Sequence, residues 1–294
     1  MSGKWKITML VNEHCKTGEN PVWDAERECV YWTDIPNGKL FRYDLATRKH
    51  EQIYSGPPVG GFTLQADGGL LLFRVSDIAV LPWRGEARTL IEVRDETMER
   101  FNDVIADQEG RVFAGTIGVN CESGGLYRID QDGSITKLFH GTGCANGSGF
   151  SPDLRLFYWT DSTSKRIFRF NYDRATGVLS NRTLVHQADS AGATPDGLTV
   201  DAEGNLWSAI WGGGCVIKHA PDGAPIEKFS LPVRTVSSVC FGGRDLDTMF
   251  VTTAEGTSDS DTCDGALFQI EGPFLGLPEF RSRIGIGPTE KTGK

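Results

Sequence analysis

The chain has 294 residues, of which 36 are Gly and 13 are Pro, so it is rich in turns without the Pro-rich composition of a disordered chain. Its formal net charge of −9 argues against nucleic acids and anionic membranes as partners, because both require a basic face. This length permits two ordinary domains, but closed all-β architectures often fold as one domain at this size.

The cysteines and the N-terminal sequence predict the cellular compartment of the protein. Seven cysteines are scattered along the chain without a C-x-x-C pair, a pattern that favours free thiols in a reducing cytoplasm. The N-terminal stretch MSGKWKITMLVNEH lacks the apolar core of a signal peptide, and no segment approaches the roughly 18 apolar residues of a membrane span. We therefore expect a soluble cytoplasmic protein.

A unit of four short strands recurs along the chain. Its first two strands form hairpins around polar or Gly-containing turns, in residues 19–31, 101–113, 145–158 and 194–207. The second strands begin near positions 31, 70, 112, 157, 206 and 249, so the period lies in the forties. A period of this length with four strands in each unit is typical of a β-propeller. The sequence thus predicts an all-β fold, a six-bladed β-propeller.

The outermost strands indicate how the ring closes. Five units have a fourth strand, in residues 50–55, 87–92, 134–139, 181–186 and 225–230. The sixth unit lacks one, and residues 4–11 at the N-terminus have the alternation of the missing strand. We expect this N-terminal strand to join the last blade and remove an exposed sheet edge. The prediction is one domain over residues 1–294, with an irregular segment from about 272 to 294 that ends in a loose tail.

Polar residues precede the first strand of most units. Because the first strands of a propeller line its channel in the same direction, these residues should meet at one mouth: Glu19, Asn102, Asn146, Asp196 and Ser237, with Gly60 and Gly61 in the second unit. Carboxylate and amide oxygens suit calcium, magnesium or manganese, and zinc is also compatible. Single Asp-Gly or Asn-Gly pairs are usually turn residues. Four equivalent polar positions favour a metal site, and two carboxylates repel each other unless a cation lies between them.

Several segments carry a family resemblance. GENPVWD (18–24), ERFNDVIAD (99–107), NGSGFSPD (146–153), YWTDS (158–162) and PDGLTVDAEGNLW (195–207) occur in order along most of the chain. At these residues the sequence resembles the senescence-marker-protein, gluconolactonase and luciferin-regenerating-enzyme (regucalcin-like) family. The resemblance implies a six-bladed propeller with one divalent metal at the channel mouth and, for many members, hydrolysis of sugar lactones.

The resemblance also implies roles for individual residues. The three metal ligands of the family fall on Glu19, Asn146 and Asp196, and its substrate-contacting Arg and Asn fall on Arg100 and Asn102. From the sequence alone, Arg100 is equally well explained as a solvated charge. A Glu in the following loop of the family corresponds to Glu122. Val104 and Ile117 replace the Gly and Met common in the family, which bears on the substrate pocket.

The sequence thus predicts a metal-dependent lactonase that acts on a sugar-acid lactone, with Asp196 as general base and the metal polarising the carbonyl group. A phosphotriesterase-like hydrolase is the alternative within enzymes, because the same metal could polarise a P=O group. A non-catalytic calcium-binding propeller is the alternative outside them. The expected partner is a small sugar lactone.

Overall fold

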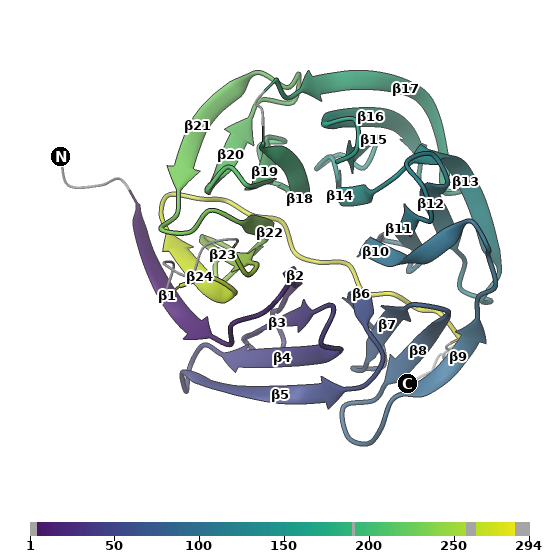
Figure 1. Cartoon of the computed structure of the whole chain (residues 1–294), viewed down its shortest axis with the longest axis horizontal. Helices are drawn as coiled ribbons and strands as arrows, with labels where there is room; N and C mark the ends of the chain where they lie inside the picture. Colours follow the sequence, from purple (N-terminus) through teal and green to yellow (C-terminus); the bar gives the residue numbers. More distant parts are fainter. Residues whose placement is uncertain (1–4, 190–191, 257–262, 286–294) are drawn as a thin grey trace, which may run out of the picture.

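The computed structural model describes residues 5–189, 192–256 and 263–285. Within these residues the regular elements are all strands, and none of the described segments is a helix that could span a membrane. Six four-stranded antiparallel sheets are arranged as blades around a central axis (Figure 1). The predicted six-bladed β-propeller is therefore confirmed. The predicted C-terminal tail (287–294) lies outside the described residues.

Each blade is a meander in which the first strand lies next to the axis. Blade 1 contains β2 (Gly18–Asp24), β3 (Cys29–Asp34), β4 (Lys39–Asp44) and β5 (Lys49–Ser55). Blade 2 contains β6 (Val59–Leu64), β7 (Leu70–Arg74), β8 (Asp77–Leu81) and β9 (Arg88–Glu92). Blade 3 contains β10 (Met98–Ala106), β11 (Val112–Gly118), β12 (Gly124–Ile129) and β13 (Ile135–Thr142).

The second half of the ring repeats this pattern. Blade 4 contains β14 (Ala145–Phe150), β15 (Leu156–Asp161), β16 (Arg166–Asp173) and β17 (Val178–Gln187). Blade 5 contains β18 (Thr194–Val200), β19 (Leu206–Trp211), β20 (Cys215–His219) and β21 (Pro225–Ser230). Blade 6 contains β22 (Val236–Gly242), β23 (Thr248–Thr253), β24 (Ala266–Glu271) and, from the N-terminus, β1 (Lys6–Asn12).

The N-terminal strand closes the ring as predicted. Strand β1 pairs antiparallel with β24, from Lys6 opposite Glu271 to Asn12 opposite Ala266. The last blade therefore combines the first and the last strand of the chain. The backbone of β24, which would otherwise form an open sheet edge, is hydrogen-bonded to β1.

Apolar side chains fill the spaces between the blades. The ring of Trp23 in blade 1 stacks on that of Phe250 in blade 6 with centroids 5.5 Å apart, and Phe73 in blade 2 meets Phe101 in blade 3 edge-on at 5.3 Å. Trp32, Trp159 and Trp207 are each about 1% exposed. Because a large apolar side chain contributes about 1.5–3 kcal/mol when fully buried, these contacts hold neighbouring blades in fixed positions.

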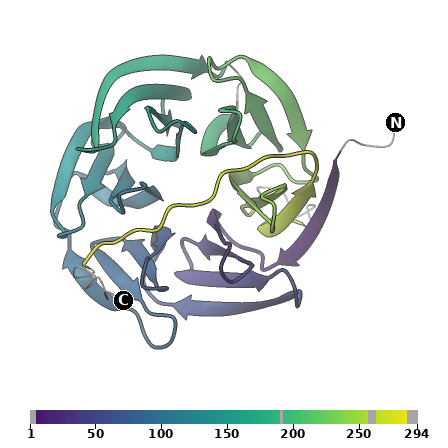
Figure 2. The same cartoon turned by 180° about the vertical axis from the view of Figure 1, so that it is seen from behind.

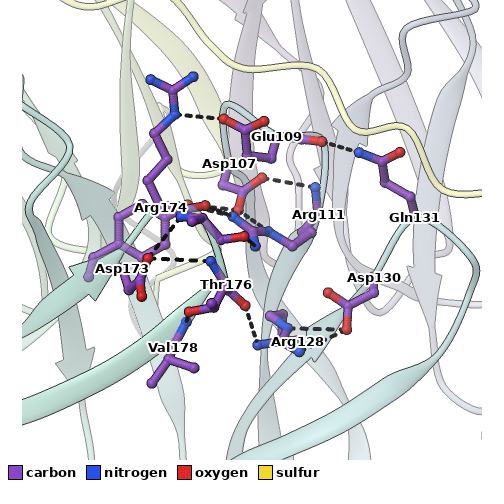
Figure 3. Close-up of polar contacts among 12 residues, drawn as sticks. Asp107, Glu109, Arg111, Arg128, Asp130, Gln131, Asp173, Arg174, Thr176 and Val178 are labelled. Carbon is purple, nitrogen blue, oxygen red and sulfur yellow. Dashed lines mark hydrogen bonds and ion pairs between the residues drawn. The ribbon is translucent and has the colours of Figure 1, made fainter.

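Charged groups add a polar joint between blades 3 and 4 (Figure 3). Arg111 donates from Nε to Asp107 Oδ2 at 2.6 Å and from Nη2 to the Tyr172 hydroxyl at 3.1 Å. Arg174 donates to Glu109 Oε1 at 2.6 Å across the same gap. The Arg111–Asp107 pair is buried and each partner is hydrogen-bonded, so the joint has a defined geometry.

The C-terminal segment (272–285) crosses one face of the ring over its centre (Figure 2). It is held by backbone hydrogen bonds to the hairpin turns of several blades: Leu275 accepts from Ala202, Gly276 donates to Leu246, and Arg283 donates to Gly110. These turns follow the first strands, so the segment lies at the end of the channel opposite to where those strands begin. A cavity of about 270 Å³ inside the channel is lined in part by residues 277–280.

Candidate active site at the channel mouth

Glu19, Asn146 and Asp196 lie within the innermost strands, near their beginnings, and not before them as expected from the sequence. Arg100 and Asn102 lie farther along β10. Each inner strand has a register shift against its neighbour at this level, for example between Glu19 and Val22, between Asn146 and Ser148, and between Pro195 and Leu198. A bulge of this kind places an extra residue in a strand and turns its side chain. The strand pairing therefore continues past the polar residues while their side chains turn toward the mouth.

A pocket of about 300 Å³ opens at this mouth. It brings together Glu19, Arg100, Asn102, Asn146 and Asp196, which come from blades 1, 3, 4 and 5. The remaining lining residues are Thr17, Ile35, Ile117, Cys144, Ser162, Thr194 and Trp211.

The two carboxylates of the pocket are buried close together. Glu19 is 4% exposed and Asp196 is 5% exposed. Burial raises the pKa of Glu19 well above its usual value, and the charges of Asp103 and Asp196 raise it further. Burial and the charge of Asp103 likewise raise the pKa of Asp196, and Arg100 and the Asn146 side chain partly oppose this effect. Their negative charges are thus costly in the protein alone, and a cation between them would remove that cost.

Asp103 is a third buried carboxylate that the sequence analysis did not assign to the site. It is 8% exposed and lines the inner cavity directly behind the mouth. Burial raises its pKa to about 7, although the charge of Arg100 opposes the shift. Strand alternation would place Asp103 on the side opposite Asn102, but the pairing of β10 shifts between Phe101 and Val104. Because of this bulge, the side-chain alternation of a regular strand does not predict where Asp103 points.

Hydrogen bonds fix the two amides of the pocket. Arg100 Nη1 donates to Asn102 Oδ1 at 2.7 Å and to the Phe101 carbonyl at 2.9 Å. Asn102 Nδ2 donates to Asn146 Oδ1 at 3.0 Å and to the Ala145 carbonyl at 2.9 Å. Burial lowers the pKa of Arg100. Its Nε and Nη2 groups have no hydrogen-bond partner within the described part of the chain, so these donors are available to a bound molecule.

The other candidates are placed differently. Glu122 is exposed in the loop between β11 and β12 and does not line the pocket. Ser237 is fully buried. Its hydroxyl group donates to the Gly18 carbonyl and lies within hydrogen-bond distance of the Thr252 hydroxyl. Gly60 and Gly61 pack directly against the backbone of Phe101 and Asn102, where a Cβ at Gly60 would lie 1.9 Å from the Phe101 oxygen. These last three positions therefore serve packing between blades.

Cys144 adds a thiol to the pocket. Its Sγ lies 3.6 Å from Asn146 Nδ2 and 3.9 Å from Asn102 Nδ2. Burial, followed by the charge of Asp196, raises the pKa of the thiol to about 12, so Cys144 is protonated at neutral pH. It is therefore a poor nucleophile in this environment.

The donor set is compatible with a hard divalent cation. Two buried carboxylates and an amide oxygen are ligands of the type that calcium, magnesium and manganese prefer. The positive charge of Arg100 opposes the raised pKa values of the two acids only in part. No group of three or more His, Cys, Asp or Glu side chains in the described residues is arranged to hold a metal. Any cation here would therefore need the amide oxygen of Asn146 or water in addition to the two acids.

A ring of six blades with one polar, acid-lined mouth defines a propeller with a small-molecule pocket on its axis. The SMP-30/Gluconolactonase/LRE-like region matches residues 17–255, and the chain belongs to this family.

Two relatives illustrate the membership, and one solved structure shares the fold. The pentonolactonase XacC of Haloferax volcanii is 39% identical over 294 residues, which cover 96% of this chain and 99% of the relative. Regucalcin of Homo sapiens is 33% identical over 282 residues, which cover 91% of this chain and 94% of the relative. A luciferin-regenerating enzyme superposes with a TM-score of 0.86 at 24% identity, over 95% of this chain and 100% of that chain, and so shares its fold.

Proposed function

We propose that this protein is a metal-dependent lactonase that hydrolyses a sugar-acid lactone to the open-chain acid. The observation that carries the proposal is the pair of buried, mutually repelling carboxylates, Glu19 and Asp196, beside Asn146 at the open mouth. Membership of a family with lactonases among its named relatives supports the same reaction.

Glu19, Asn146 and Asp196 would hold a divalent cation through their oxygen atoms; calcium, zinc, manganese and magnesium are the candidates. When bound, such a cation supplies a Lewis acid that polarises the lactone carbonyl and stabilises the developing oxyanion. All further steps depend on side chains of the chain itself.

Asp196 acts as the general base in this mechanism. It accepts a proton from a water molecule while the water oxygen forms its bond to the carbonyl carbon. The ring C–O bond then breaks, and the ring oxygen takes up that proton to become a hydroxyl group. One water is consumed, and one hydroxy acid is formed.

Arg100 and Asn102 orient the substrate. The free Nε and Nη2 donors of Arg100 can bind sugar hydroxyls or the ring oxygen. Asn102 is already fixed by Arg100 and Asn146, so it offers a rigid contact at low entropic cost. Glu122, the remaining residue that the sequence predicts to contact the substrate, is not among the residues that line the pocket. A role in substrate binding would require it to contact the substrate from outside this lining.

The test is turnover by chelator-treated protein refilled with each of the four metals, measured with a pH indicator on a panel of pentono- and hexonolactones. Metal-restored acid release is expected, and Asp196→Asn should lower it by about 10²–10⁴-fold. Asp222→Asn, at an exposed turn of the same blade, is the matched control.

Three outcomes would contradict parts of the proposal. Full lactonase rate in Asp196→Ala would refute the mechanism. Turnover of a phosphotriester such as paraoxon in place of every lactone would favour the phosphotriesterase reading. Metal binding without turnover of any substrate would favour a calcium-binding propeller.

A further inference from the structure

Ser162 is the last member of a hydrogen-bond chain that begins at Arg100. Its hydroxyl accepts a hydrogen bond from Asn146 Nδ2 at 2.9 Å and donates one to the Pro195 carbonyl at 2.7 Å. Together with the bonds from Arg100 to Asn102 and from Asn102 to Asn146, this chain crosses blades 3, 4 and 5. It ends one residue before Asp196.

The direction of the chain is fixed at both ends. An arginine side chain can only donate hydrogen bonds, and a proline carbonyl can only accept them. Every amide and hydroxyl between Arg100 and Pro195 must therefore donate in the same direction. The nitrogen and oxygen of an Asn side chain are assigned from such a network, and here the network admits one orientation for Asn146. Its nitrogen points to Ser162, and its oxygen points the other way.

We infer that Ser162 is a positioning residue that sets the amide of Asn146 so that its oxygen is presented to the cation site. This inference rests on the proposed function, since it assigns a role in metal binding. Without the Ser162 oxygen, the only neutral acceptor left to Asn146 Nδ2 in the described residues is the weak one of Cys144 Sγ, at 3.6 Å. The amide can then rotate and place its NH₂ group where the ligand oxygen belongs. The bond to Pro195 also ties the Asn146 amide of blade 4 to the strand that holds Asp196.

The backbone at this position is held independently of the hydroxyl group. Ser162 N donates to the Cys144 carbonyl at 3.1 Å, and the Ser162 carbonyl accepts from Lys165 N at 3.2 Å. Both bonds persist in Ser162→Ala, so the turn after β15 should keep its shape. Ser164, in the same turn, donates to Asp161 Oδ2 at 2.6 Å and does not line the pocket. Ser164→Ala therefore removes a comparable hydroxyl without touching Asn146.

The experiment is calorimetric titration of calcium, zinc, manganese and magnesium into the chelator-treated full chain, followed by the tightest-binding metal for each variant. Loss of an outer hydrogen-bond partner of a metal ligand typically lowers metal affinity by 10–100-fold, and we expect that loss for Ser162→Ala. Ser162→Thr keeps the hydroxyl and should recover most of the affinity. Ser164→Ala should bind metal as the wild type does.

A double-mutant comparison separates positioning of the amide from general weakening. A carboxylate presents an oxygen in either orientation, so in an Asn146→Asp background the loss of Ser162 should change the metal affinity by less than about threefold, against the 10–100-fold expected with Asn146. An equal loss in both backgrounds would overturn the inference, as would wild-type affinity in Ser162→Ala. Equal losses in Ser162→Ala and Ser164→Ala, with matching falls in melting temperature, would assign Ser162 to the stability of the turn.

The wild-type titration distinguishes failure of this inference from failure of the proposed function. Wild-type protein that hydrolyses lactones and binds metal, together with an unaffected Ser162→Ala, would refute only the role of Ser162. Wild-type protein that binds none of the four metals would refute the metal site itself and the positioning role with it.

Discussion

Asp103→Asn tests whether ionised carboxylates near the channel mouth destabilise the folded protein when no cation is bound. Asp103 is 8% exposed, and its carboxylate accepts no hydrogen bond from the residues described. Burial raises its pKa from 3.8 to about 7. A carboxyl group with a raised pKa stabilises the folded protein while it is protonated, and this contribution is lost as the pH rises through about 7.

The size of the effect follows from the shift. One pKa unit corresponds to about 1.4 kcal/mol, so a shift of about three units makes ionised Asp103 destabilising by about 4 kcal/mol at pH 8. About 2–3 kcal/mol of this develops between pH 5 and pH 8. The amide of Asn introduces buried donors that cost about 1–3 kcal/mol, but this cost is the same at both pH values.

The assay is unfolding in chelator at pH 5 and at pH 8. Relative to wild type, Asp103→Asn should gain about 2–3 kcal/mol of unfolding free energy on going from pH 5 to pH 8, or roughly 2 °C of melting temperature per kcal/mol. Glu86→Gln removes an exposed carboxylate and should show no such gain. Added metal should reduce the gain in unfolding free energy of Asp103→Asn relative to wild type, because a cation at the mouth stabilises ionised Asp103. If the stability of Asp103→Asn relative to wild type did not rise with pH, ionised Asp103 would not destabilise the protein and the prediction would be refuted.

Three further outcomes follow from other parts of the structure. Asp196→Asn should raise the stability of the metal-free protein at pH 8, because it removes a buried charge that other carboxylates repel. The variant should also lack the thermal stabilisation that metal gives the wild type, and melting curves with and without metal check both expectations. Trp211→Ala should raise KM about 2–10-fold with little change in kcat if the indole packs on the substrate, whereas Trp83→Ala in blade 2 should leave KM unchanged in lactone kinetics. Glu279→Gln should stabilise the protein at pH 8 by about 1–2 kcal/mol and less at pH 5 in urea unfolding, since burial raises the pKa of this half-buried carboxyl to about 7.

The fold was predictable because each blade repeats the same local signals. Turn residues and strand alternation recur with a period in the forties, and a missing last strand is matched by a spare strand at the N-terminus, β1. Such signals are local and act in every repeat. The C-terminal segment has no repeat to compare with. Its path across the channel depends on contacts with distant turns such as those of Ala202 and Gly110, which no local pattern encodes.

The candidate site was predictable only in part. Glu19, Asn146 and Asp196 were found because they occupy equivalent positions in different blades, and the ring brings such positions together. Asp103 was missed because a bulge in β10 breaks strand alternation. Ser162 follows a second strand, so only the packing of blade 4 against blade 5 reveals its contact.

The geometry of the channel also bears on how a product would leave. The C-terminal segment crosses the far end, and the pocket that Glu19 and Asp196 line opens at the other, so on the proposed reaction substrate and product would both pass through this mouth. A lactone enters as a neutral molecule, but the product is a carboxylate at neutral pH. It is formed beside buried acids in a chain with a net charge of −9, where like charges repel strongly because little water screens them. Arg100 offsets part of this repulsion while the substrate is bound. A cation held between Glu19 and Asp196 would cancel much of this repulsion, so only the negative charge that the cation leaves uncompensated would favour departure of the anion.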